Sequence, residues 1–185
     1  MVFILEQTIN RLKKALEQKL PGQDAQYLMA PQNRERIERE LMKTGQYKPS
    51  AVMILFCEDE EGRLFIPLTE RRTYDGAHSG QVSLPGGKYD AADGDLSETA
   101  RRECYEEIGV SELEILGKLT ELHIPVSGFL VQPFVGYCKL KNPEMIQHQR
   151  EVKQILKLEL NHLLDDASIE QGTIEISGNL KIKTP

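Results

Sequence analysis

The chain has 185 residues, of which 39% are hydrophobic and 28% are charged, and its formal net charge is −6 at pH 7. This length and balance indicate one globular domain with a modest extension, and they exclude a disordered chain. The negative charge argues against a broad nucleic-acid-binding surface, which needs a basic face, so we expect no nucleic-acid partner. A small phosphate ligand stays compatible with this charge, because a pocket can be locally basic or hold a metal.

The cysteines and the N-terminus give indications of the cellular compartment of the protein. Cys57, Cys104 and Cys138 are far apart in apolar segments and form no CxxC or Cys/His cluster, which predicts free buried thiols in a reducing environment. The apolar start at residues 1–5 is too short for a signal peptide and lacks a basic region. No apolar run approaches the length of a membrane span, so we expect a cytoplasmic protein without a membrane partner.

Residues 1–48 are predicted to form a helical extension. Apolar residues recur there at helical spacing before Pro21-Gly22, namely Leu5, Ile9, Leu12, Leu16 and Leu20. A second, heavily charged helical candidate covers residues 34–42. We interpret the apolar stripe as a face packed on the main domain, and a homodimer contact is its alternative use.

From residue 49 to residue 185 the pattern is that of one domain of mixed strands and helices. Strands are predicted at residues 51–57, 64–68, 81–84, 113–122 and 129–140, with a closing hairpin at 174–182. Residues 85–87 are predicted to form a turn, and residues 154–164 are ambiguous between strand and helix. Strands and helices intermixed around one core indicate an α/β fold.

Residues 96–108 have the features of an isolated helix with clear ends. Asp95, followed by Glu98, is typical of a helix start with a capping box, and Gly109 suits the position just after the end. Ala100, Cys104 and Ile108 form an apolar stripe that can face the core.

The acidic residues of this helix are poorly placed for stability. Glu103 and Glu107 are four residues apart and repel each other. Glu106 and Glu107 occupy the last turn, where the helix dipole makes each acid cost about 0.3–1 kcal/mol. A hard divalent cation, Mg²⁺ or Mn²⁺, bound by these carboxylates would relieve the conflict. A solvated acidic face is the ordinary alternative for a Glu-rich helix.

Arg102 and the preceding acidic loop complete the segment. We expect Arg102 to pair with Glu98 one turn earlier and with Glu106 one turn later, and so to hold the carboxylates in position. The loop acids Asp90 and Asp93 do not have the spacing of a calcium-binding loop, so turn formation and capping is the better interpretation of them.

The run Arg102-Glu103-Cys104-Tyr105-Glu106-Glu107-Ile108-Gly109-Val110 resembles the second half of the signature of the Nudix hydrolase family. The first half departs from it, because the spacing from Gly87 to Arg102 is one residue longer and Gly94 lies near the place of the first Glu. This longer loop resembles the coenzyme A pyrophosphatase branch of the family.

Residues 68–71 and 80–87 resemble the second motif of that branch. Gly76 stands where the motif usually has an Arg, and Leu84 stands where it has a Phe, so an anion contact is missing or is supplied elsewhere. The resemblance covers residues 50–182.

The resemblance implies an α/β/α sandwich with a mixed sheet and the metal-dependent hydrolysis of a nucleoside diphosphate linked to another moiety. The implied direct metal ligands are Glu103 and Glu107, with Glu106 as a third, and the ion would be Mg²⁺ or Mn²⁺. Arg102 joins these residues as part of the catalytic set. One of the glutamates, or a later acid such as Glu151, would take the proton from the attacking water.

For the coenzyme A branch the reaction is coenzyme A plus water giving 3′,5′-ADP and 4′-phosphopantetheine. The candidates for substrate binding are Arg71, Arg72, His78, Gly86, Gly87 and Lys88. The two glycines would let the backbone approach the helix and the diphosphate, and a simple tight turn is the alternative. Other Nudix substrates (ADP-ribose, dinucleotides, nucleotide sugars) and a catalytically silent nucleotide-binding module are the alternative functions.

The end of the chain differs from the sequences it resembles, which continue into an apolar helix covering one face of the sheet. Residues 183–185 leave no room for this helix. An uncovered face would expose an apolar patch larger than monomers tolerate. We therefore expect the N-terminal helix or a second subunit to cover it, and a truncated chain is the alternative.

Overall fold

The computed structural model describes residues 3–28, 30, 47–72, 80–124, 127–170, 172–176 and 180–184. The helical candidate at residues 34–42, Gly76 and His78 lie outside these residues. The helices are α1 (Phe3–Leu16), α2 (Gln23–Leu28), α4 (Leu96–Ile108) and α5 (Leu160–Leu163), with short 3₁₀ turns η1 (Ala91–Asp93) and η2 (Asp166–Ser168). The strands are β1 (Lys48–Glu58), β2 (Leu64–Arg71), β3 (Val82–Ser83), β4 (Gly86–Lys88), β5 (Leu113–Lys118), β6 (Leu122–Ile124), β7 (Phe129–Lys141), β8 (Val152–Glu159), β9 (Gly172–Ile176) and β10 (Leu180–Thr184).

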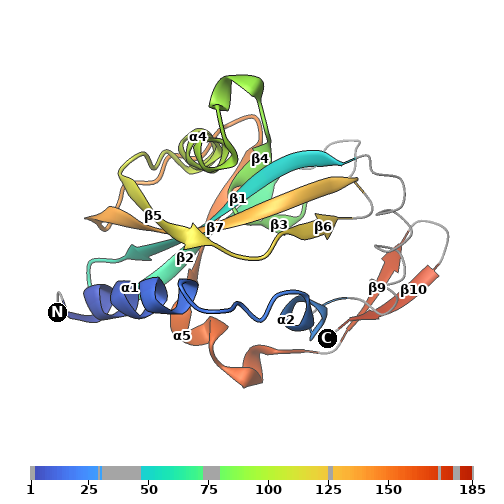
Figure 1. The fold of residues 1–185 in the computed structure, drawn as a ribbon, viewed down its shortest axis with the longest axis horizontal. Helices are drawn as coiled ribbons and strands as arrows, with labels where there is room; N and C mark the ends of the chain where they lie inside the picture. Colours follow the sequence, from blue (N-terminus) through green and yellow to red (C-terminus); the bar gives the residue numbers. More distant parts are fainter. Residues whose placement is uncertain are drawn as a thin grey trace.

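The main sheet is mixed and is built around β1 (Figure 1). β1 pairs in parallel with β7 and antiparallel with β2 and β4. The sheet continues in the order β3-β2-β1-β7-β5, while β6 pairs with β7 and β8 pairs with β2. β9 and β10 form the separate closing hairpin that the sequence predicts.

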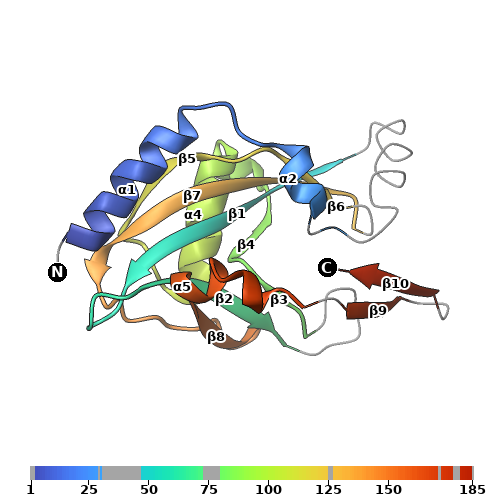
Figure 2. The same ribbon diagram turned by 90° about the horizontal axis from the view of Figure 1, so that it is seen from below.

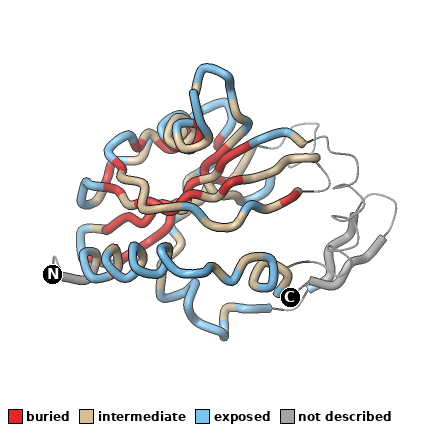
Figure 3. The backbone as a smooth tube through the Cα atoms, viewed as in Figure 1, coloured by how far each residue is buried: buried red, intermediate tan, exposed pale blue. Residues whose placement is uncertain are grey.

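Both faces of β1 are covered, as its continuous apolar run predicts. Ala51, Met53, Leu55 and Cys57 alternate along the strand and form one core cluster with Ala100, Cys104 and Ile108 of α4. Phe56 of β1 belongs to a second cluster, which Leu12 and Leu16 of α1 join. Figure 1 shows α4 on one side of the sheet and α1 on the other, and Figure 3 shows the buried residues gathered between them. The predicted α/β/α sandwich with a mixed sheet is confirmed.

Several predicted boundaries were wrong. Residues 85–87 do not form only a turn, because Gly86 and Gly87 belong to β4, which is paired with β1. The ambiguous segment is a strand, β8, followed by the short helix α5. The predicted strand 113–122 is divided into β5 and β6, and the first helix ends at Leu16 rather than near Leu20.

α1 packs on the face opposite α4, along β5 (Figure 2). Gly117 of β5 allows this approach, since a Cβ atom there would lie 3.2 Å from Cδ1 of Leu16. The helix therefore covers part of the face opposite α4, and the compensation for a missing C-terminal helix stays a prediction. The domain boundary at residue 48 and the homodimer stay predictions. Within the residues that the structure describes, no helix is long and apolar enough to cross a membrane.

We expect Leu16→Ala to destabilise the protein, because Leu16 lies over Gly117 in the second core cluster. The side chain is only partly buried, so the loss in unfolding free energy should be about 1–2 kcal/mol. Urea denaturation measures it. Lys14→Ala, an exposed position on the same helix, serves as the control and should stay within about 0.5 kcal/mol of the parent. Equal stability of the two variants would show that α1 does not hold this face.

Candidate active site

Both ends of α4 are fixed by hydrogen bonds. The Asp95 carboxylate accepts from the backbone N–H groups of Ser97 and Glu98, and Gly109 ends the helix in the left-handed conformation with φ 76°. At the C-terminus the backbone N–H groups of Ile146 and His148 donate to the carbonyls of Ile108 and Glu107. The loop that satisfies these carbonyls continues to Glu151, so capping the helix also sets the position of that acid.

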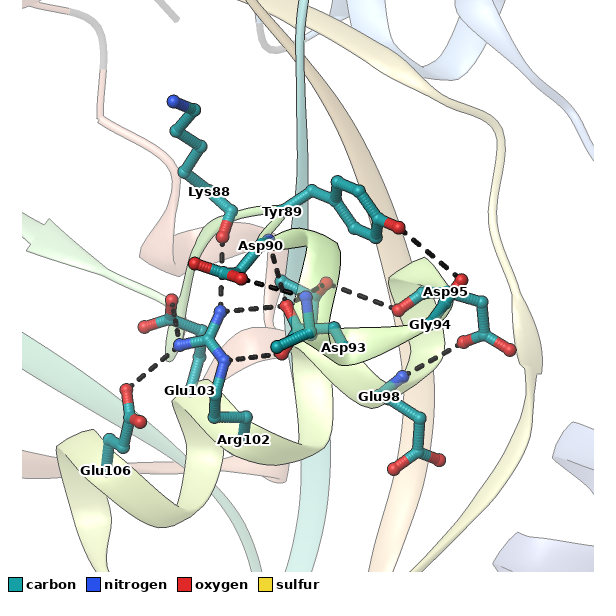
Figure 4. Close-up of polar contacts among 12 residues, drawn as sticks. Lys88, Tyr89, Asp90, Asp93, Gly94, Asp95, Glu98, Arg102, Glu103 and Glu106 are labelled. Carbon is teal, nitrogen blue, oxygen red and sulfur yellow. Dashed lines mark hydrogen bonds and ion pairs between the residues drawn. The ribbon is translucent and has the colours of Figure 1, made fainter.

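Arg102 holds the acidic loop and the helix together (Figure 4). Its guanidinium donates to Asp93 at 2.7 and 3.0 Å, to Glu103 at 2.8 Å and to Glu106 at 3.0 Å. It also donates to the carbonyl of Lys88 at 3.2 Å. The predicted pairing with Glu106 is confirmed and that with Glu98 was wrong, because Glu98 lies 3.4 Å from Arg101 instead.

Asp93 therefore does more than form and cap the turn, which is the role predicted for it from the sequence. It completes a reciprocal capping box with Asp90, and its carboxylate also accepts from the Thr99 hydroxyl at 2.8 Å. The hydrogen bonds from Arg102 are the main reason why the pKa of Asp93 lies well below its ordinary value. The side chain of Asp93 is only 4% exposed, so this charge is paired inside the protein rather than in solvent.

The two glycines of β4 allow the strand to approach its neighbours, α4 and β1, closely. A Cβ atom on Gly87 would overlap the carboxylate of Glu103, and one on Gly86 would overlap the backbone of β1 at Ala51 and Val52. The backbone N–H of Gly86 donates to Oε2 of Glu107 at 3.2 Å. Close approach of β4 to α4 therefore explains Gly87, and close approach of β4 to β1 explains Gly86.

A groove of about 740 Å³ lies beside this strand and helix. That volume is in the range of small-molecule sites. One end holds charged residues, namely Glu103, Glu107, Glu151, Arg71 and Lys88. The other end is lined by uncharged residues of β6, β7 and their flanking segments, namely Leu119, Thr120, Leu122, Ile124, Ser127, Phe129, Val131 and Pro133, together with Gln26 of α2.

The carboxylates at the charged end are electrostatically strained. Burial raises the pKa of Glu107 to about 7, against the lowering effects of the Gly86 N–H and of Arg71, and Glu103 and Glu151 raise it further. Burial also raises the pKa of Glu103, with Arg102 opposing and the charges of Glu106 and Glu151 adding to the rise. A divalent cation between these acids would replace this repulsion by attraction, so the donor set fits a hard metal ion.

The predicted site residues do not all come together. Glu103 and Glu107 line the groove, whereas Glu106 is half exposed, pairs with Arg102 and is not among the lining residues. Among the described residues no three His, Cys, Asp or Glu side chains form a ready-made metal cluster. The predicted metal set thus fits the structure best as Glu103 and Glu107 with Glu151 nearby, and the role of Glu106 stays a prediction.

Only some of the residues predicted to bind substrate line the groove. Arg71 lines the groove with its guanidinium 3.8 Å from Glu107, and Lys88, Gly86 and Gly87 line it too. Arg72 is exposed and is not among the lining residues, although its backbone N–H donates to the carbonyl of Glu151. The structure thus leaves Arg72 outside the lining of the groove, and its role in substrate binding stays a prediction.

Two lining residues, Gln26 and Ser127, were missed by the sequence reasoning. Gln26 belongs to the N-terminal segment, which was considered as packing or as a homodimer contact, and it donates to the carbonyls of Thr120 at 3.0 Å and Glu121 at 3.3 Å. Ser127 lies between the strands predicted at residues 113–122 and 129–140, a place with no pattern of its own. Neither has a sequence signal, because each contacts the groove through tertiary structure alone.

The structure has a mixed sheet between helices, and its glycine-containing strand β4 lies against the acidic helix α4, whose carboxylates are held by Arg102. Together these features define a class of proteins. The NUDIX domain model matches residues 47–173, and the chain belongs to the Nudix family. Members of this family generally use divalent metal ions.

Curated relatives agree with this membership. The chain is 35% identical over 126 residues to Nudix hydrolase 15, mitochondrial, of Arabidopsis thaliana, covering 65% of this chain and 44% of that protein. It is 32% identical over 117 residues to the mitochondrial coenzyme A diphosphatase NUDT8 of Homo sapiens, covering 62% and 50%. It is 43% identical over 90 residues to the uncharacterized Nudix hydrolase NudL of Yersinia enterocolitica, covering 47% and 44%. The matches span about half the length of these relatives.

Solved structures share the fold. The Nudix hydrolase RenU of M. smegmatis superposes with a TM-score of 0.52 at 16% identity, covering 64% of this chain and 74% of that one. A Nudix hydrolase of Alicyclobacillus acidocaldarius gives a TM-score of 0.51 at 15% identity, covering 64% and 82%.

We expect Asp93→Asn to weaken metal binding at α4, because it removes the charge that holds Arg102 beside Glu103. Partners that orient a ligand in this way are typically worth about 10–100-fold in metal affinity. Electron paramagnetic resonance of Mn²⁺ titrations measures it. Asp90→Asn makes the same change in the same loop without touching Arg102 and is the control. Equal Mn²⁺ affinities in the two variants would contradict this role of Asp93.

The burial of Glu107 should make the metal-free protein less stable as the pH rises. Its pKa is about 7 in the folded chain against an ordinary 4.5. The folded state therefore binds the extra proton between these values, and its contribution to stability is lost as the pH rises through about 7. Urea unfolding in EDTA should show a steeper fall from about pH 5 to 8 in the parent than in Glu107→Gln. Identical slopes would contradict the raised pKa.

Proposed function

We propose that the chain is a metal-dependent diphosphate hydrolase that acts on coenzyme A or its derivatives, giving 3′,5′-ADP and 4′-phosphopantetheine. The observation that carries this proposal is the groove, whose lining combines three glutamates and two cationic side chains with a larger number of uncharged residues. The similarity to the human coenzyme A diphosphatase supports the choice of substrate.

The charges at that end suit a diphosphate. Arg71 and Lys88 offer positive charge to the phosphoryl oxygens, and a bound cation would neutralise the rest while lowering the pKa of water. Glu103 and Glu107 are the residues that would hold this cation, since their carboxylates are buried together beside β4. Repulsion between a diphosphate and an attacking hydroxide is the barrier that such charges reduce.

The proton of the attacking water needs an acceptor at the same end of the groove. Glu103, Glu107 and Glu151 are the carboxylates there. Glu107 has a pKa of about 7 in the metal-free protein, whereas Glu151 is the most exposed of the three. Glu151 remains available as a proton acceptor when the two buried carboxylates are engaged with a cation, which makes it our candidate for that role.

A panel of diphosphates assayed with Mg²⁺ and Mn²⁺ tests the proposal. Coenzyme A, its thioesters and its disulfide should be cleaved with a higher kcat/KM than ADP-ribose, dinucleotides or nucleotide sugars. A far higher kcat/KM for ADP-ribose would assign the chain to another Nudix activity. Binding of nucleotides without turnover of any substrate would assign it to the silent modules.

Glu107→Gln in the same assay should reduce turnover by at least about 100-fold while circular dichroism stays unchanged, because it removes a carboxylate that would hold the cation. Glu98→Gln makes the same change on the same helix, away from the groove, and should keep parent activity. Near-normal turnover in Glu107→Gln would contradict the mechanism.

A further inference from the structure

The uncharged end of the groove contains a buried polar atom with no partner. Oγ of Ser127 is inaccessible to solvent and makes no hydrogen bond within the described part of the chain. Leaving a hydroxyl buried and unpaired costs about 1–3 kcal/mol. Ser127 lines the groove, so rotation of its side chain toward a ligand that enters this end would give the hydroxyl its missing partner.

A second polar group reaches the same end from the N-terminal segment. The side-chain amide nitrogen of Gln26 donates to the carbonyls of Thr120 and Glu121, and neither bond uses its Oε1 atom. The residue precedes the matched family domain, which begins at residue 47. A segment outside the common domain therefore forms part of the groove wall.

The lining residues of this end suit an uncharged part of a substrate. The lining residues on β6, β7 and α2 carry no charge, while Arg71 and Lys88 lie on β2 and β4. One cation, Lys48 of β1, lies beside this end, with its ammonium 3.5 Å from the Ser127 carbonyl and 5.7 Å from the centre of the Phe129 ring, whereas Arg71 and Lys88 are both at the charged end. In coenzyme A the adenosine carries a dianionic 3′-phosphate, which would therefore meet less positive charge here than at the charged end. The pantetheine arm is an uncharged, largely apolar chain with two amides, which matches apolar walls with a few polar groups.

We infer, on the basis of the proposed function, that the uncharged end of the groove binds the pantetheine arm, with Ser127 and Gln26 as its polar contacts. The Ser127 hydroxyl and the Gln26 amide oxygen meet amide groups of the arm, while Leu122, Ile124 and Phe129 contact its apolar carbons. Ser127 is then a specificity residue. Its unpaired hydroxyl destabilises the free protein, and this loss of stability is offset only when the arm is bound.

Pantetheine itself is the probe, because it has the arm and no phosphate. Its binding is measured by nuclear magnetic resonance titration of the whole chain in EDTA, where no turnover occurs. Ser127→Ala and Gln26→Ala should each weaken pantetheine about threefold to tenfold, the range of one neutral hydrogen bond. Gln18→Ala, an exposed position, is the matched control and should leave the affinity unchanged.

Thermal unfolding of the free protein separates recognition from structure. Because the Ser127 hydroxyl is unpaired, Ser127→Ala should unfold at the parent temperature or above it while binding pantetheine more weakly. A lower unfolding temperature would mean that the hydroxyl stabilises the free protein, which overturns the inference. Unchanged pantetheine affinity in both groove variants also overturns it, as does a weakening of adenosine binding in place of pantetheine binding.

The two proposals fail in different ways. A parent protein that binds pantetheine through Ser127 but cleaves no coenzyme A overturns the proposed function alone. A parent that cleaves coenzyme A while the variants keep full pantetheine affinity overturns this inference alone.

Discussion

The rest of the site depends on the hydrogen bonds and ion pairs that the guanidinium of Arg102 makes. This group joins the loop at Asp93, the strand carbonyl at Lys88 and the helix acids Glu103 and Glu106. Three carboxylates around one cation would otherwise repel each other and the dipole of the helix end. Since Asp93 is nearly inaccessible and Arg102 only 30% exposed, this network is protected from solvent screening and fixes the loop to the helix.

Once the loop is fixed, backbone geometry sets the positions of the remaining acids. β4 can lie this close to α4 because Gly87 has no side chain there, and close to β1 because Gly86 has none, and the arrangement brings the Gly86 backbone N–H to Glu107. That N–H and Arg71 only partly compensate the burial of Glu107, whose pKa stays at about 7. The site is thus assembled with an excess of negative charge, which is the condition that favours a divalent cation.

The sequence predicted the parts that depend on local pattern. The α4 helix, its end at Gly109, its buried stripe and the long strands β1, β2 and β7 follow from periodicity and capping residues. Contacts made across the fold were predicted poorly. Arg102 reaches Asp93 nine residues earlier rather than Glu98 one turn earlier, because η1 folds back against the helix. The spacing of residues along a helix contains no information about such a loop. For this reason only a turn-forming role was predicted for Asp93.

The N-terminal segment was predicted to pack on the main domain, and its position also makes it part of the groove. α1 places Leu12 and Leu16 over the sheet, and α2 follows after a short connection and holds the loop at Thr120 through Gln26. The same segment therefore stabilises one face of the sheet and forms a wall of the groove. Because the two helices are joined closely, a change that loosens α1 should also move Gln26, so stability of the sheet and shape of the groove are coupled through a segment that precedes the common domain.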